Sequence, residues 1–129
     1  MEARELRINN WVNVTNKLTG FTIDNIITAS GLLDLYSNKE RSSFTYQPIP
    51  LTEEWLLKFG FKNQIIKINC YSIIELDFNS KEYPVYNCFL KQKNSDSTND
   101  SFLMDVEIQY VHQLQNLYFA LTNKELTIK

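Results

Sequence analysis

The sequence predicts an α+β protein with a mainly antiparallel sheet and two helices, a short one near 52–59 and a second near 110–122. In the two helical segments, apolar residues recur at intervals of three and four, whereas alternation with polar residues is typical of half-buried strands. Such alternation occupies the segments 64–78, 83–92 and 102–109. Short turns between these segments favour antiparallel neighbours, with helices packed on the sheet.

The short helix is defined by residues at both of its ends. In TEEWLLKFGF (52–61), Thr52 is a good N-cap, and Glu53 and Glu54 lie in the first turn, where the helix dipole favours negative charge. Gly60 is suited to the left-handed conformation that ends a helix. The sequence therefore predicts a helix from Thr52 to Gly60. We expect it to bury three side chains: Trp55, Leu56 and Phe59.

The second helix is predicted over 110–122, where apolar residues recur at intervals of three and four and would lie on one face. Asn123 follows it and is suited to the left-handed conformation that ends a helix. We expect this face to bury Leu114, Tyr118 and Leu121. A short terminal strand is expected at 125–129, because Leu126 alternates with Ile128.

The first fifty residues indicate extended segments, which we place at 6–14, 21–30, 32–37 and 44–51. Asn9 and Asn10 interrupt the first one and favour a turn or bulge there. Farther along, turns are expected near 69–72 and at 79–82. No internal repeat or long linker occurs, so residues 1–129 are predicted to form a single domain.

The charge and the apolar pattern exclude several classes of protein. The chain of 129 residues has 13 Lys and Arg against 15 Asp and Glu, which gives a net charge of -2. Strong general affinity for nucleic acid normally needs a basic surplus, so we do not expect it. No apolar run reaches the roughly 20 residues of a membrane span, and the N-terminus lacks a signal-peptide core. We expect a cytoplasmic protein in which Cys70 and Cys88 are buried reduced thiols; their adjacency stays open.

Residues with catalytic or metal-binding chemistry are sparse. His112 is the single histidine, and the two cysteines lack CxxC spacing, so we expect no metal, no cofactor and no catalytic residue. Three glycines are too few for a glycine-rich phosphate cradle. His112 is either a general base or partner contact, or a helix-edge residue bonded to a neighbouring strand, and we favour the second interpretation.

The polar loop KNSDSTND (93–100) is the best candidate for a contact surface, because long loops in compact domains are often functional. It could equally be a hairpin tip without function. The predicted partner-binding residues are Lys91, Lys93, Asn94, Asp96 and Tyr86. An alternative is a surface on which bases stack. Its aromatic residues would be Trp11, Trp55, Tyr83, Tyr86 and Phe89, with Lys62, Lys67, Lys91 and Lys93 nearby.

Three stretches resemble a family of small uncharacterised proteins from Bacteroidetes genomes and their phages. They are ELRINNWV (5–12), QPIPLTEEWLLKFGF (47–61) and YVHQLQNLYFALTNKELTI (110–128), about a third of the chain. The family pattern has Gly in place of Asn9 or Asn10, and often Gly at Asn123. Asn also tolerates a left-handed backbone, so these departures keep the local geometry.

The resemblance implies a phage setting and carries no enzymatic residues. Small acidic phage proteins without active sites are often inhibitors of host defence, including an inhibitor of a type VI RNA-guided RNase. We therefore expect a phage-encoded, non-enzymatic anti-CRISPR protein that binds a host protein or ribonucleoprotein, such as a type VI nuclease with its guide RNA. The alternatives are a phage accessory protein that binds RNA or DNA, and a small enzyme of unknown class.

Each hypothesis predicts a different surface. An inhibitor should expose an apolar or aromatic patch with a polar rim. A nucleic-acid accessory protein should carry a stripe of Lys and Arg. An enzyme should have a deep pocket with convergent polar groups of shifted pKa.

Overall fold

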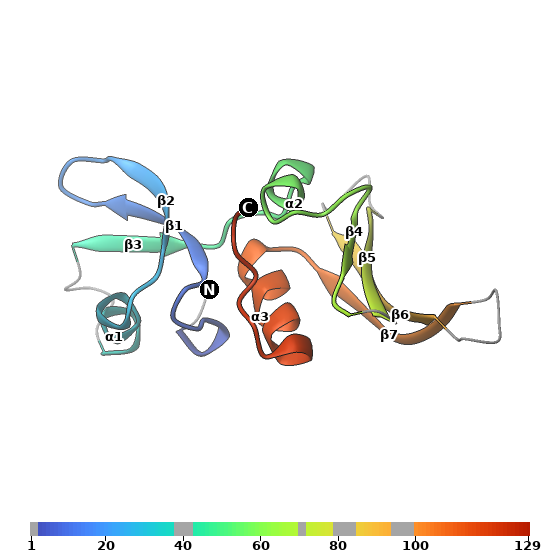
Figure 1. Cartoon of the computed structure of the whole chain (residues 1–129). Helices are drawn as coiled ribbons and strands as arrows, with labels where there is room; N and C mark the ends of the chain where they lie inside the picture. Colours follow the sequence, from blue (N-terminus) through green and yellow to red (C-terminus); the bar gives the residue numbers. More distant parts are fainter. Residues whose placement is uncertain (1–2, 38–42, 70–71, 79–84, 94–99) are drawn as a thin grey trace. The chain divides into compact units, whose positions relative to one another are not determined.

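The computed structural model describes residues 3–37, 43–69, 72–78, 85–93 and 100–129, and its fold class is α+β, as predicted (Figure 1). The chain divides into two compact units. The first comprises Met1–Pro50 and Tyr110–Glu125, and the second comprises Leu51–Gln109 and Leu126–Lys129. Each unit contains one antiparallel sheet.

The sheet of the first unit has the order β2-β1-β3, with both outer strands antiparallel to the central one. The strands are β1 (Trp11–Asn16), β2 (Thr22–Ile26) and β3 (Phe44–Gln47). The first strand starts later than the expected residue 6. A 3₁₀ turn, η1 (Ala3–Glu5), precedes it, and Asn9 has a φ of 80°, which is incompatible with an extended strand.

The expected strand at 32–37 is wrong, because these residues belong to the helix α1 (Ala29–Ser37). The segment LLDLYS also contains the helical spacing of Leu32 and Leu35. Both side chains pack against the buried cluster of Leu6, Val12 and Ile27. The hydroxyl of Thr28 accepts a hydrogen bond from the Gly31 N–H at 3.3 Å, which satisfies a donor in the first turn. The weak alternation of this segment favours a strand, but the burial of two leucines three residues apart stabilises the helix more.

The helix predicted near 110–122 is confirmed as α3 (Val111–Thr122), and it ends at Asn123 with a φ of 58°. The side-chain oxygen of Gln113 accepts a hydrogen bond from the Tyr110 N–H at 3.0 Å, which stabilises its start. Leu114 is fully buried, as expected. Tyr118 and Leu121 are largely buried, as expected, although neither is among the fully buried residues.

The short helix is confirmed as α2 (Glu53–Lys58), and both of its predicted ends have the expected geometry. The Thr52 hydroxyl accepts from the Trp55 N–H at 3.4 Å, and Gly60 follows the helix with a φ of 91°. The three side chains expected in its core are buried: Trp55, Leu56 and Phe59.

The sheet of the second unit has the order β4-β5-β6-β7, and every neighbouring pair is antiparallel. Its strands are β4 (Ile65–Lys67), β5 (Ser72–Phe78), β6 (Tyr86–Lys93) and β7 (Asp100–Ile108). The alternation in the sequence predicts all four of them. Ile74, Leu76 and Cys88 are buried on one face.

Some predictions concern segments outside the described residues, namely the turn at 79–82, positions 94–99 of the polar loop, and Cys70. The terminal strand expected at 125–129 is wrong, since this segment joins no sheet. Instead, the Lys129 N–H donates to the Lys58 carbonyl at the end of α2, at 2.8 Å. Among the described residues, none of the helices is of a length and apolarity that could cross a membrane.

Candidate functional site: an apolar pocket on the sheet of the first unit

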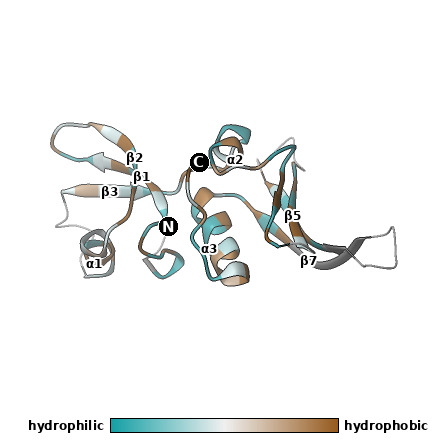
Figure 2. Cartoon of the chain, in the orientation of Figure 1, coloured by the Kyte–Doolittle hydropathy of each residue, from teal (hydrophilic) through white to brown (hydrophobic). Residues whose placement is uncertain are grey.

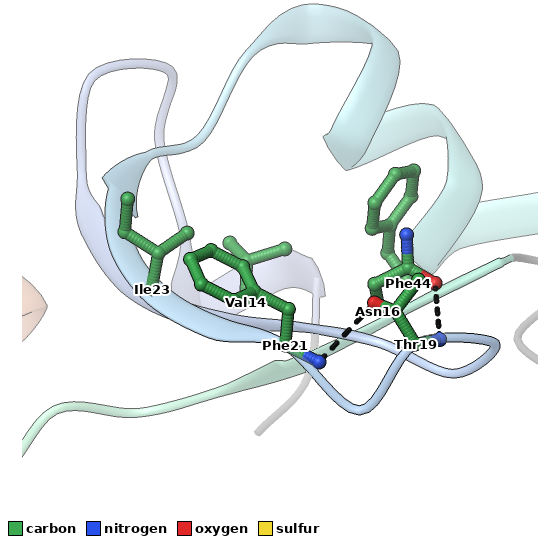
Figure 3. Close-up of a pocket in the computed structure, with 6 residues that line it drawn as sticks. All are labelled: Val14, Asn16, Thr19, Phe21, Ile23 and Phe44. Carbon is green, nitrogen blue, oxygen red and sulfur yellow. Dashed lines mark hydrogen bonds between the residues drawn. The ribbon is translucent and has the colours of Figure 1, made fainter.

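An open pocket of about 440 Å³ lies on one face of the β2-β1-β3 sheet (Figure 3). Its lining comes from all three strands and from the turn between β1 and β2. The lining residues are Val14, Asn16, Thr19, Phe21, Ile23 and Phe44. Four of the six are apolar, so the pocket offers chiefly hydrophobic contact.

The strand register explains why these side chains share a face. Val14 lies opposite Ile23 on β2, and Asn16 lies opposite Phe44 on β3. Residues that are directly opposite in antiparallel strands point to the same side, as do alternate residues along one strand. The side chains of Val14, Phe21, Ile23 and Phe44 accordingly project from one side of the sheet in Figure 3.

Helix α1 covers only part of this apolar face. Near Val12 the face is buried, and Tyr46 packs with the leucines of α1. Beyond this cover, Phe21 is 66% exposed, Ile23 is 50% exposed and Phe44 is 41% exposed. Neighbouring exposed apolar side chains of this size mark interaction sites more often than isolated ones do. The hydropathy colouring marks hydrophobic stretches on all three strands (Figure 2).

The polar side chains in the lining hold the turn in place. The Asn16 side-chain oxygen accepts hydrogen bonds from the Leu18 N–H at 2.9 Å and the Thr19 N–H at 3.3 Å. The Thr19 hydroxyl accepts from the Phe21 N–H at 3.2 Å (Figure 3). Gly20 supplies the positive φ, 73°, that this turn needs. These contacts position Phe21 and leave apolar contact as the main attraction for a ligand.

Near the turn, the opposite face of the same hairpin is polar. The Asn13 amide donates to the Asp24 carboxylate at 3.0 Å, and the hydroxyls of Thr15 and Thr22 are 2.9 Å apart. Both pairs are exposed and link directly opposite residues. The hairpin is therefore amphipathic, with its apolar side at the pocket.

None of the six side chains that line the pocket is an acid or a base. Among the described residues, burial raises the pKa of Tyr46 and Tyr86 above the usual value. Burial also lowers the pKa of His112, an effect that the nearby Glu5 opposes in part. All three lie outside the lining, so the pocket has no tuned acid or base for proton transfer.

His112 lies in the interior, and only 2% of it is exposed. Its ring stacks on Tyr110 with the centroids 5.8 Å apart. Within the described part of the chain, its Nδ1 has no hydrogen-bond partner. The expected hydrogen bond to a neighbouring strand is therefore not made at this nitrogen, and packing holds the imidazole.

The residues predicted to bind a partner do not form one surface in the described structure. Tyr86 is 4% exposed and belongs to the core, whereas Lys91, five positions along β6, points to the other face. Lys91 forms an ion pair with Glu75 on β5. Lys93 lies at the end of β6 opposite Asp100. Asn94 and Asp96 are outside the described residues, so a contact there stays a prediction.

Phe21, Ile23 and Phe44 are the residues that sequence reasoning missed as a site. The alternation of Phe21 and Ile23 indicates one face of a strand, but it does not show whether another element covers that face. One signal was available: α1 spans nine residues, or about 14 Å, which is too short to cover the whole face. That signal depends on recognising α1 as a helix. No family model, curated protein or solved structure matches this chain.

Proposed function

We propose that this protein acts by binding another protein, and that the apolar pocket on the β2-β1-β3 sheet is its contact surface. The observation that supports the proposal is the exposure of Phe21, Ile23 and Phe44 side by side on one sheet face. Asn16, the last residue of β1, and Thr19, in the turn that follows, form a polar border. Large apolar anchors with a polar rim are typical of the centres of protein interfaces.

Two other functions have less support. An enzyme of unknown class would need convergent polar groups in its pocket, and the lining contains none that titrates. A base-stacking surface would need accessible aromatic residues, but Trp55 and Tyr86 are buried. Of the lysines proposed to accompany them, Lys91 is paired with Glu75. Both observations favour protein binding without turnover.

A more specific proposal rests on the resemblance to phage proteins. We propose that the partner is a host defence effector in the bacterial cytoplasm, and that binding inhibits it. A CRISPR nuclease, such as a type VI RNase with its guide RNA, is the best candidate. The net charge of -2 argues against simple competition for RNA and favours contact with the protein part of such a complex.

An interference assay with two matched variants tests this function. Phe21→Asp places a charge in the pocket, whereas Leu57→Asp places the same charge on α2, where Leu57 is 62% exposed. Desolvating an unpaired carboxylate at an interface should reduce inhibition by about tenfold or more for Phe21→Asp. Leu57→Asp should inhibit like the unmodified protein. Circular dichroism must first show that both variants fold.

Photo-crosslinking tests protein binding without assuming which effector is involved. A benzoylphenylalanine at position 21 should crosslink to a partner protein in the natural host, and the same group at position 57 should not. Full inhibition by a folded Phe21→Asp variant, together with no crosslink specific to position 21, would contradict the proposed function.

A further inference from the structure

Strand β2 forms an open edge of its sheet, and Asp24 is its one charged residue. The order β2-β1-β3 leaves one side of β2 without a partner strand among the described residues. All five residues of β2 are exposed, and its sequence, TIDNI, contains neither Lys nor Pro. Proteins normally protect edge strands with Lys, Pro or a bulge, because an open edge templates pairing with another chain. The other edge, β3, is followed directly by Pro48.

The register shows which backbone groups of β2 point to this open edge. The Asn16 N–H donates to the Phe21 carbonyl, and the Ile27 N–H donates to the Asn10 carbonyl, both at 2.8 Å. In an antiparallel ladder, hydrogen-bonded positions alternate with positions whose N–H and C=O face away. Positions 23 and 25 therefore bond to β1, whereas Thr22 and Asp24 present their backbone groups outward. The Ile26 N–H is already taken by the Asn25 side chain at 2.8 Å, which closes one end of the edge.

The apolar area indicates a small occupant. The exposed fractions of Phe21, Ile23 and Phe44, 66%, 50% and 41%, together amount to about one and a half large apolar side chains, or roughly 200–400 Å². A stable dimer of standard size buries about 800 Å² on each partner. The pocket alone is therefore too small to hold a second copy of the chain, and it fits one or two apolar side chains of a short segment.

The charges of the hairpin complete the description of the occupant. The pocket lining contains no charged residue, whereas the opposite face of β2 exposes Asp24. The side chains of a strand added beside β2 would point alternately to these two faces, and its backbone would lie about 4.8 Å from that of β2. Every second side chain would then lie beside Phe21 and Ile23, and the side chains between them would lie beside Asp24. Its best sequence would alternate apolar residues with Lys, Arg or amide residues.

We propose that the partner is bound as an extended segment of alternating apolar and basic or amide residues, which adds as a strand to the open edge of β2 and places an apolar side chain in the pocket. The inference rests on the proposed function and specifies its mode. Main-chain hydrogen bonds to Thr22 and Asp24 would supply affinity, and the pocket would supply selectivity.

Two synthetic peptide libraries of equal composition and about eight residues, with blocked termini, test this mode on the full chain. One library has apolar residues at alternate positions with Lys or Gln between them, and the other has them at helical spacing. We expect binding from the alternating library, measured by fluorescence anisotropy. Absence of binding from it, or binding from the helical library alone, would overturn strand addition.

Two variants at position 24 separate the backbone contact from the side-chain contact. Asp24→Pro removes the outward N–H without removing a ladder bond to β1, and edge strands tolerate Pro at such positions. Because a buried hydrogen bond is lost, the best peptide should bind about tenfold more weakly. Asp24→Ala keeps the N–H and loses an exposed carboxylate, so it should weaken binding by about threefold at most. Equal affinities of both variants for this peptide would overturn the inference.

If Asp24→Pro does not fold, N-methylated peptides can test the main-chain hydrogen bonds on the unmodified protein. Methyl groups on the amides that face β2 should abolish binding, whereas methyl groups on the alternate amides should not. Insensitivity to all N-methyl groups would reject strand addition. The crosslink at position 21 tests protein binding at the pocket separately. If strand addition is wrong but the proposed function is right, the crosslink will form although the peptide experiments fail.

Discussion

The guanidinium of Arg7 donates to the carboxylate of Glu125 at 2.7 Å, although the two residues are 118 positions apart in the sequence. The same side chain lies over the ring of Phe119, 4.1 Å from its centroid, and its Nε donates to the Asn116 side-chain oxygen at 2.9 Å. Arg7 thus joins the N-terminal segment to α3, which brings the two parts of the first unit together.

Replacing Arg7 should destabilise the protein measurably. Arg7→Met keeps much of the apolar stem but loses the ion pair, the hydrogen bonds and the contact with the ring. We expect the free energy of unfolding in urea to fall by about 2 kcal/mol. Arg7→Lys should recover little of this, because an ammonium group does not reproduce the planar fork. Lys124→Met, at an exposed lysine, is the control and should change stability by about 0.5 kcal/mol at most.

Gln115 should be needed for a second link between these segments. It is 1% exposed, its side-chain oxygen accepts from the Trp11 N–H at 2.8 Å, and its amide donates to the Asn9 carbonyl at 3.2 Å. Gln115→Leu would remove the partners of both part-buried backbone groups, and we expect a loss of about 1–3 kcal/mol for the two contacts together. Denaturant titration measures the change. A loss of about 0.5 kcal/mol or less would show that other groups replace these contacts.

Gly60→Ala should destabilise the end of α2. Its φ of 91° is strained for any residue with a Cβ, and the added methyl would come within 2.9 Å of the Lys129 side chain. Because that side chain can move, the backbone term dominates, and the expected cost is about 1 kcal/mol or more. Gly20→Ala is the comparison, since its φ of 73° is similar and the new methyl would meet no atom within 4 Å. Thermal melts of both variants separate strain from contact.

His112 should make stability depend on pH. Burial lowers its pKa in the folded protein, so the folded state resists protonation more than the unfolded state does. As the pH falls below the unfolded value of about 6.5, the unfolded chain takes up a proton first, and the free energy of unfolding decreases. At higher pH this loss is absent. The negative charge of Glu5 opposes the effect without reversing it.

The pH dependence is checked by comparison with His112→Gln, which cannot take up this proton. Unfolding free energies measured between about pH 7.5 and 5.5 should fall more steeply for the unmodified protein than for the variant. Parallel curves would mean that His112 titrates alike in both states. The comparison cancels the carboxylates, which titrate in both proteins.

Local patterns in the sequence predict a large part of the fold. The ends of α2 follow from Thr52 and Gly60, because capping depends on residues within one helical turn. The four strands of the second sheet follow from alternation, which reports on burial of one face. Asn123 predicts the left-handed end of α3 for the same local reason.

Where two local patterns compete, only packing decides between them. LLDLYS contains both an alternating and a helical spacing, and α1 forms because Leu32 and Leu35 reach the cluster around Val12. The expected terminal strand had alternation but finds no sheet edge to join. The partial exposure of Tyr118 likewise depends on which elements surround α3, and helical spacing carries no information on that.

By itself, the sequence determined the class, α+β, the two capped helices and the alternating strands, because these depend on contacts between residues close in the chain. Only the tertiary structure decided that Phe21, Ile23 and Phe44 form an open pocket and not a closed core. A strand pattern shows that one face is apolar, but cover for that face comes from another element. Here α1 covers one end of it and leaves the other exposed, which is the physical origin of the candidate site.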